Sequence, residues 1–145
     1  MKLLLFTCAR SYSVDRQTNA VSVFNVVERL AAREFPCSLP DLHVISVLKR
    51  DRLGTNLPLR LSVTIEGHTL LDEPFEVTFS DDGTARTFGR VGDLSVPVPG
   101  EVAFTFWRGN EKLGEWNIEM VEVPKTLQRS PIHEHEERAP HQFLN

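Results

Sequence analysis

The residues best suited to bind a metal ion lie near the end of the printed sequence. His133 and His135 are two residues apart among three glutamates, and His141 follows six residues after His135. In an extended backbone His133 and His135 project from the same side, a spacing that Zn²⁺ or Ni²⁺ can use. A structural zinc site needs four ligands and a rigid frame to hold them. In this segment we predict no strand, turn glycine or apolar wall that could hold the imidazoles. We favour a solvated tail, with a metal site or a partner-binding segment as alternatives, and expect no cofactor.

Nucleophilic catalysis is not favoured by this sequence. Cys8 lies in the most apolar stretch, where a thiol is usually an inert small hydrophobe. A reactive thiol or hydroxyl would also need a nearby histidine and an orienting carboxylate. His43, at the start of a predicted strand, and His68, in a predicted turn, fit surface or hydrogen-bonding roles better than catalysis. We therefore expect no catalytic residues and no enzymatic activity.

One aromatic residue is a candidate for partner binding. Trp107 follows Phe106 and falls on the opposite face of its predicted strand, since successive side chains of a strand point to opposite sides. An exposed tryptophan can anchor a partner protein, and Arg108 belongs to the same candidate surface. Packing of Trp107 beneath a loop or the C-terminal tail is the structural alternative.

Composition narrows the class of protein. The 145 residues are 41% hydrophobic and 25% charged, which is typical of one globular domain. The net charge of −4 and the scattered basic residues argue against nucleic acid as a partner. The apolar run at 3–6 is too short for the core of a signal peptide, so we expect a cytoplasmic protein without a membrane segment. Two cysteines in such a protein are expected to be free thiols.

Apolar residues recur mostly with a period of two between turn residues, which predicts half-buried strands. The stretch 59–79 shows this best, with a turn at Glu66-Gly67. The inward residues there are Leu59, Leu61, Val63 and Ile65 before the turn and Phe75, Val77 and Phe79 after it. Residues 100–123 predict a second hairpin that turns at Gly109-Asn110 and points Phe104 and Phe106 inward.

Two further stretches complete the prediction. Residues 3–9 predict a strand covered on both faces, and another strand begins at Leu42. Residues 20–34 are ambiguous, because valines and a phenylalanine favour a strand to about Val27 whereas 28–34 is rich in helix formers. We favour a strand that continues into a bend or short helical turn over a helix across 20–34.

Together these elements predict an all-β protein. We expect an antiparallel β-sandwich of seven or eight strands, Ig-like or jelly-roll-like, over residues 1–124. After Pro124 the alternation is lost and charges and prolines accumulate, so 125–145 is predicted to be a mobile polar tail.

The order of these elements resembles a bacterial family of uncharacterised small β-sandwich proteins. The similar parts are the apolar first strand, the stretch "SVFNVVERL", Phe35-Pro36 and the closing hairpin. The resemblance implies a β-sandwich and carries over no catalytic residues.

The function that the sequence favours is a non-enzymatic binding or scaffold module whose partner is another protein. A homo-oligomeric structural component that assembles through strand edges is one alternative. A metal-binding protein that uses the histidines of the tail is the other.

Overall fold

The computed structural model describes residues 1–51 and 58–124. These residues form eleven strands and no helix, so the predicted all-β class is confirmed. The predicted boundary at Pro124 lies at the end of the described part of the chain. The tail at 125–145 lies outside it.

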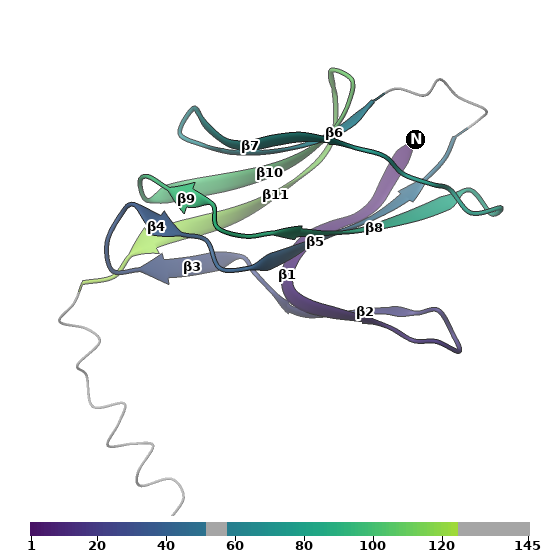
Figure 1. The fold of residues 1–145 in the computed structure, drawn as a ribbon, viewed down its shortest axis with the longest axis horizontal. Coiled ribbons are helices and arrows are strands. Elements are labelled where there is room, and N and C mark those ends of the chain that lie inside the picture. The colour runs from purple at the N-terminus through teal and green to yellow at the C-terminus, as the bar shows by residue number, and fades with distance from the viewer. Residues whose placement is uncertain (52–57, 125–145) are drawn as a thin grey trace, which may run out of the picture.

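The strands form two main sheets and one short ladder (Figure 1). The four-stranded sheet has the order β2-β1-β5-β8 and consists of β1 (Lys2–Val14), β2 (Val21–Val26), β5 (Leu42–Lys49) and β8 (Thr84–Val91). The five-stranded sheet has the order β3-β11-β10-β6-β7 and consists of β3 (Arg29–Ala32), β6 (Leu59–Ile65), β7 (His68–Phe75), β10 (Gly100–Arg108) and β11 (Glu111–Glu122). The ladder pairs β4 (Cys37–Ser38) with β9 (Ser95–Val96). All these pairs are antiparallel except β3 and β11, which run parallel.

The two main sheets share one hydrophobic core. Side chains from β1, β5 and β8 of the four-stranded sheet meet side chains from β6, β10 and β11 of the five-stranded sheet. Phe104 and Phe106 are the largest fully buried or nearly fully buried side chains, and both face inward as the alternation predicts. Burial of each such side chain contributes about 1.5–3 kcal/mol to the free energy of folding.

Both predicted hairpins are present. β6 and β7 are joined at Glu66 and Gly67, whose φ angles are 44° and 77°, as a two-residue turn with the twist of a hairpin requires. β10 and β11 are joined at Gly109 and Asn110, with Gly109 at a φ of 58°. Positive φ costs a residue with a Cβ more than it costs glycine, which favours glycine in both turns although Glu66 also adopts it.

The ambiguous segment forms two strands that lie in different sheets. β2 confirms the predicted strand, and it continues into a bend at Glu28, as one of the two predicted continuations has it. The other, a short helical turn, is not formed, because β3 pairs with the end of β11 and this pairing outweighs helix propensity. The chain passes between the sheets at Val27, which is buried. Its N–H donates to the Cys8 carbonyl at 2.9 Å, and its carbonyl accepts from Trp116 Nε1 at 2.8 Å.

Three details of the structure differ from what the sequence alternation predicts. β7 ends at Phe75 rather than near Phe79, because β6 begins at Leu59, directly opposite Phe75, and offers no further partner. Residues Leu4 and Leu5 of β1 are 51% and 40% exposed, so this strand is not covered on both faces as predicted. The described residues form eleven strands where seven or eight were expected, and the three shortest are β3, β4 and β9.

The β1–β2 hairpin folds over the outer face of the four-stranded sheet. β1 pairs with β5 only up to Ala9 and with β2 only from Ala9 onward, so the strand changes partner there. Beyond that point Tyr12 stacks on Phe88 of β8 with ring centroids 4.4 Å apart, and the Asn19 carbonyl accepts from Arg86 of β8 at 2.7 Å. Figure 1 shows this hairpin alongside β8. Only β1, β5 and β8 therefore face the five-stranded sheet.

The shared core predicts a large difference between the two faces of one hairpin. Replacement of the fully buried Phe104 by alanine is expected to lower the free energy of unfolding by about 3–5 kcal/mol. The matched substitution Asn117→Ala, on the exposed face of β11, is expected to change it by less than about 0.5 kcal/mol. Denaturant unfolding of both variants measures these values, and equal losses would contradict the assignment of faces.

Candidate functional site

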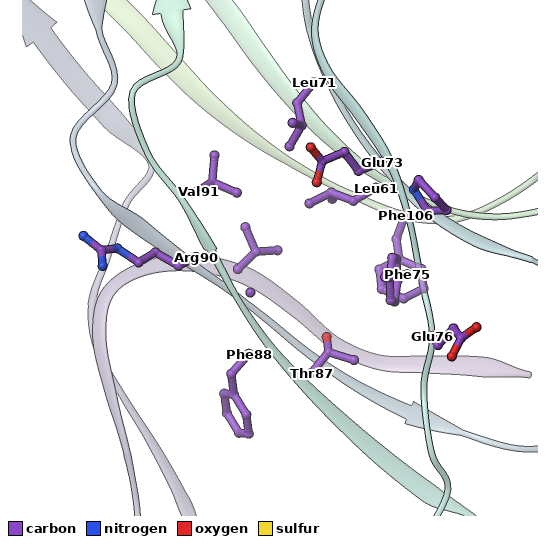
Figure 2. Close-up of a pocket in the computed structure, with 13 residues that line it drawn as sticks. Leu61, Leu71, Glu73, Phe75, Glu76, Thr87, Phe88, Arg90, Val91 and Phe106 are labelled. Atoms are coloured by element: carbon purple, nitrogen blue, oxygen red, sulfur yellow. The ribbon is translucent and has the colours of Figure 1, made fainter.

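A cleft lies between β7 and β8, which are the edge strands of the two main sheets (Figure 2). It arises because three strands face five, so the inner faces of β6 and β7 are incompletely covered. Its volume is about 300 Å³, at the small end of the range for ligand sites. The lining residues are Val44, Leu61, Leu71, Glu73, Pro74, Phe75, Glu76, Thr87, Phe88, Gly89, Arg90, Val91 and Phe106.

The floor of the cleft is part of the hydrophobic core. Leu61 and Leu71 pack against the core but remain only partly buried, and Phe75 packs edge-on against Phe106 with ring centroids 4.7 Å apart. Val91 contributes from the opposite strand. Apolar surface that a fuller sheet would bury is thus available to a ligand.

Gly89 opens the cleft. It pairs with Val44 in the ladder between β5 and β8, and its strand neighbours Thr87 and Val91 both line the cleft, so position 89 faces inward. A Cβ built at Gly89 would meet only the Val44 carbonyl oxygen, at 3.9 Å, which is an ordinary contact. The glycine is therefore not required by packing against its neighbours, and its effect is to leave space where other strand residues place a side chain.

Glu73 places a carboxylate at an inward position. It pairs with Leu61 and lies between Leu71 and Phe75 on the same face of β7. Figure 2 shows its carboxylate projecting into the space between the two strands. Within residues 1–51 and 58–124 it has neither an ion-pair partner nor a side-chain hydrogen bond. Glu76 lines one end of the cleft, but Figure 2 shows its carboxylate directed away from the space between the strands, so a cationic group would be attracted to Glu73.

The basic residue of the cleft is directed elsewhere. Arg90 and Phe88 point away from the space between the strands in Figure 2. Arg90 forms an ion pair with Asp41, and the hydrogen bond that it donates to this carboxylate raises the pKa of the guanidinium. Phe88 is stacked on Tyr12. The charge offered to a ligand inside the cleft is consequently negative.

A hydrogen-bonded turn precedes β8. The connection from β7 to β8 places Val77 and Phe79 against the core. The Asp82 carboxylate accepts hydrogen bonds from Ser80, which has the larger effect, and from Thr84. These bonds favour the ionised form and lower the pKa of Asp82 to about 2. The bond from the Thr84 N–H to Asp82 Oδ1 is 3.0 Å long, and it fixes the point where β8 begins.

The remaining polar group at the cleft is already satisfied. The Thr87 hydroxyl is hydrogen-bonded to Ser46, its partner on β5. The titratable residues that line the cleft are Glu73, Glu76 and Arg90. This set can pair with a cation beside an apolar group, which is the chemistry of a binding site.

The predicted partner residues Trp107 and Arg108 lie outside the cleft. Trp107 is half-buried, its Nε1 donates to Ser62 Oγ at 2.9 Å, and Arg60 covers its ring at 5.1 Å from the centroid. Asp72 holds Arg60 in turn, at 3.0 Å. Arg108 pairs with Glu111 at 2.8 Å. Both residues are thus engaged within the described part of the protein, where Arg60 covers the ring of Trp107.

The other predicted residues are scattered. His43 packs edge-on against Tyr12 at 5.2 Å between centroids, and His68 is exposed at the start of β7. His133, His135 and His141 lie outside the described residues. Within the described ranges, no three histidine, cysteine, aspartate or glutamate side chains are grouped to hold a metal ion.

Sequence reasoning missed both residues that give the cleft its character. Gly89 is a glycine inside the strand "TARTFGRV", a position that often marks a site where another group approaches closely. Glu73 interrupts the inward apolar series of β7 between Leu71 and Phe75. Each is a local exception to the alternation, and each could have been found as one.

Comparison with protein-family models gives no match, and comparison with curated proteins gives none either. In the described part of the chain no helix has the length and apolar character needed to cross a membrane.

The two thiols are expected to differ in reactivity. Cys8 is fully buried, and burial raises its pKa to about 12, whereas Cys37 is only half-buried. Because the thiolate is the nucleophile and a raised pKa lowers its fraction, iodoacetamide at pH 8 should modify Cys37 and spare Cys8 in the folded protein. Mass spectrometry of peptides checks this, with guanidinium-unfolded protein as the control in which both react. Equal modification of both thiols in the folded state would contradict the burial of Cys8.

Proposed function

We propose that the protein is a non-enzymatic binding module that engages another protein through the cleft between β7 and β8. The observation that carries the proposal is the inward-facing Gly89, which leaves the apolar floor accessible instead of covered by a side chain. Glu73 adds an unpaired carboxylate beside that floor. An apolar pocket with a few placed polar groups is the usual form of a ligand site.

We further propose that the two main sheets form an Ig-like sandwich rather than a jelly roll. The order β1-β5-β8 facing β11-β10-β6-β7 corresponds to the Ig order A-B-E facing G-F-C-C′. The hairpins β6–β7 and β10–β11 occupy the places of C–C′ and F–G. In this assignment no strand of residues 1–51 and 58–124 takes the place beside β8 of the strand called D, which pairs with E in Ig constant domains.

We also propose that the protein belongs to the bacterial family that its sequence resembles, and that it is located in the cytoplasm. Both fit a scaffold module whose two cysteines are free thiols.

Filling the cleft is expected to abolish binding without loss of stability. In Gly89→Leu the new side chain enters the cleft, and the free energy of unfolding should stay equal or rise by about 0.5–1 kcal/mol, because glycine weakens a strand. Random heptapeptides displayed on phage are first selected for binding to the unmodified protein. The selected peptides should bind Gly89→Leu at least about tenfold more weakly than they bind the unmodified protein.

Asn117→Leu is the matched control, because it adds the same side chain to the exposed face of β11. Selected peptides should bind this variant and the unmodified protein equally. Selection that yields no peptide sensitive to Gly89→Leu would overturn the proposed site.

A second candidate function, a homo-oligomeric structural component, is favoured by exposed apolar side chains on the β1–β2 hairpin. Phe24 and Val26 of the edge strand β2 are 49% and 46% exposed. On this alternative, light scattering during gel filtration at about 100 μM shows a dimer that the double substitution Phe24→Ser, Val26→Ser converts to a monomer. Val98→Ser, at another exposed apolar side chain, serves as the control. A monomeric unmodified protein would eliminate this candidate.

A further inference from the structure

We infer that the partner contributes one extended segment that pairs with the free edge of β8 and places a basic side chain beside Glu73. The inference rests on the proposed function, since it names the ligand of the same cleft. In the Ig-like assignment this segment takes the place of the missing strand D.

The free edge of β8 has the backbone groups that such pairing requires. β5 is the only strand of the described residues that pairs with β8. The Thr84 carbonyl accepts from the Ser80 N–H at 2.9 Å, and in the described structure no other backbone hydrogen bond reaches β8 from outside β5. The edge from Ala85 to Val91 therefore presents unpaired N–H and C=O groups, which are a template for an added strand.

The opposite edge, on β7, is less suited to pairing. Pro74 lies inside this strand and has no N–H to donate, which is typical of a blocked edge. Asp72 and Glu73 precede it, and charged residues on an edge also discourage pairing. Of the two edges that border the cleft, β8 is thus the one that can accept a strand.

The position of the cleft determines which side chains the segment needs. Next to β8, every second side chain of an added strand points the same way as Thr87, Gly89 and Val91, which is into the cleft. There it meets the apolar surface of Leu61 and the carboxylate of Glu73, which are partners across β6 and β7. A segment with a lysine or arginine between two apolar residues on one face fits both the apolar surface and the carboxylate.

Charge supports a basic segment. Inside the cleft the charged group is the carboxylate of Glu73, because Arg90 points outward and is paired with Asp41, and the Glu76 carboxylate also points away. The chain as a whole has a net charge of −4. An acidic segment would be repelled both by Glu73 and by the net charge of the chain. An uncharged segment would bury the Glu73 carboxylate without a partner, which costs free energy.

The probe is the blocked hexapeptide Val-Thr-Lys-Thr-Val-Thr, whose alternate residues place Val-Lys-Val on one face. Titration into ¹⁵N-labelled protein should shift amide signals of β8 and of Glu73. Alternate amides between Ala85 and Val91 should also become protected from hydrogen exchange, because only every second N–H of a strand points to the free edge. Replacement of lysine by glutamate in the peptide should weaken binding at least about tenfold.

Two N-methylated peptides test strand pairing itself. One carries methyl groups on the amides of the odd residues and the other on those of the even residues, so each blocks a single edge of the peptide. One of the two should lose at least about tenfold in affinity and the other should bind like the parent. Glu73→Gln should remove the preference for lysine over glutamate.

The outcomes separate the two proposals. The first outcome is that the peptide binds, that Gly89→Leu prevents its binding, and that both methylated peptides bind as tightly as the parent. The cleft is then a binding site, and strand addition is wrong. If the hexapeptide does not bind at about 5 mM, the inference is overturned, while selection of other peptides still tests the cleft. Binding that is unaffected by Gly89→Leu overturns both proposals.

Discussion

The unequal size of the two sheets is the constraint on which the rest of the structure depends. Three strands face five, so the core is complete over β10 and β11 and incomplete over β6 and β7. Apolar side chains at the incomplete end cannot all be buried, and the cleft beside Leu61 and Leu71 is the result. The connection from β7 to β8 covers only one end of this region, through Val77 and Phe79.

The fourth strand of the smaller sheet does not relieve the mismatch, because the β1–β2 hairpin is held on the outer face. Stacking of Tyr12 on Phe88 and the bond from Arg86 to Asn19 fix it there. At its base, Trp116 binds the Val27 carbonyl, where the chain leaves for the other sheet. The hairpin is anchored at both ends, and Tyr12 contacts Phe88 and His43 on the outer face, so the hairpin adds nothing to the inner one.

The parts of the fold that could be predicted from sequence are those set by local pattern. Alternation and positive-φ turn glycines identify both hairpins and the inward Phe104. The parts that could not be predicted depend on partners far away in the chain: β3 is a strand only because β11 lies beside it, and β7 stops opposite Leu59, where β6 begins. The cleft belongs to this second group. Gly89 and Glu73 are visible as exceptions in their strands, but only the facing of two edges brings them to one space.

Glu73 raises the question of whether an inward carboxylate on an edge strand is a binding group or a device against aggregation. The two roles use the same physics, since an unpaired charge beside apolar surface penalises any apolar strand that approaches and favours one that brings a cation. Pro74 already blocks the β7 edge, whereas β8 has no proline and carries Gly89 at its inward position. Protection alone would be needed most on β8, yet the charge lies across the cleft from it. That placement leaves the β8 edge open and puts the charge beside the space next to it, as the proposed binding site requires.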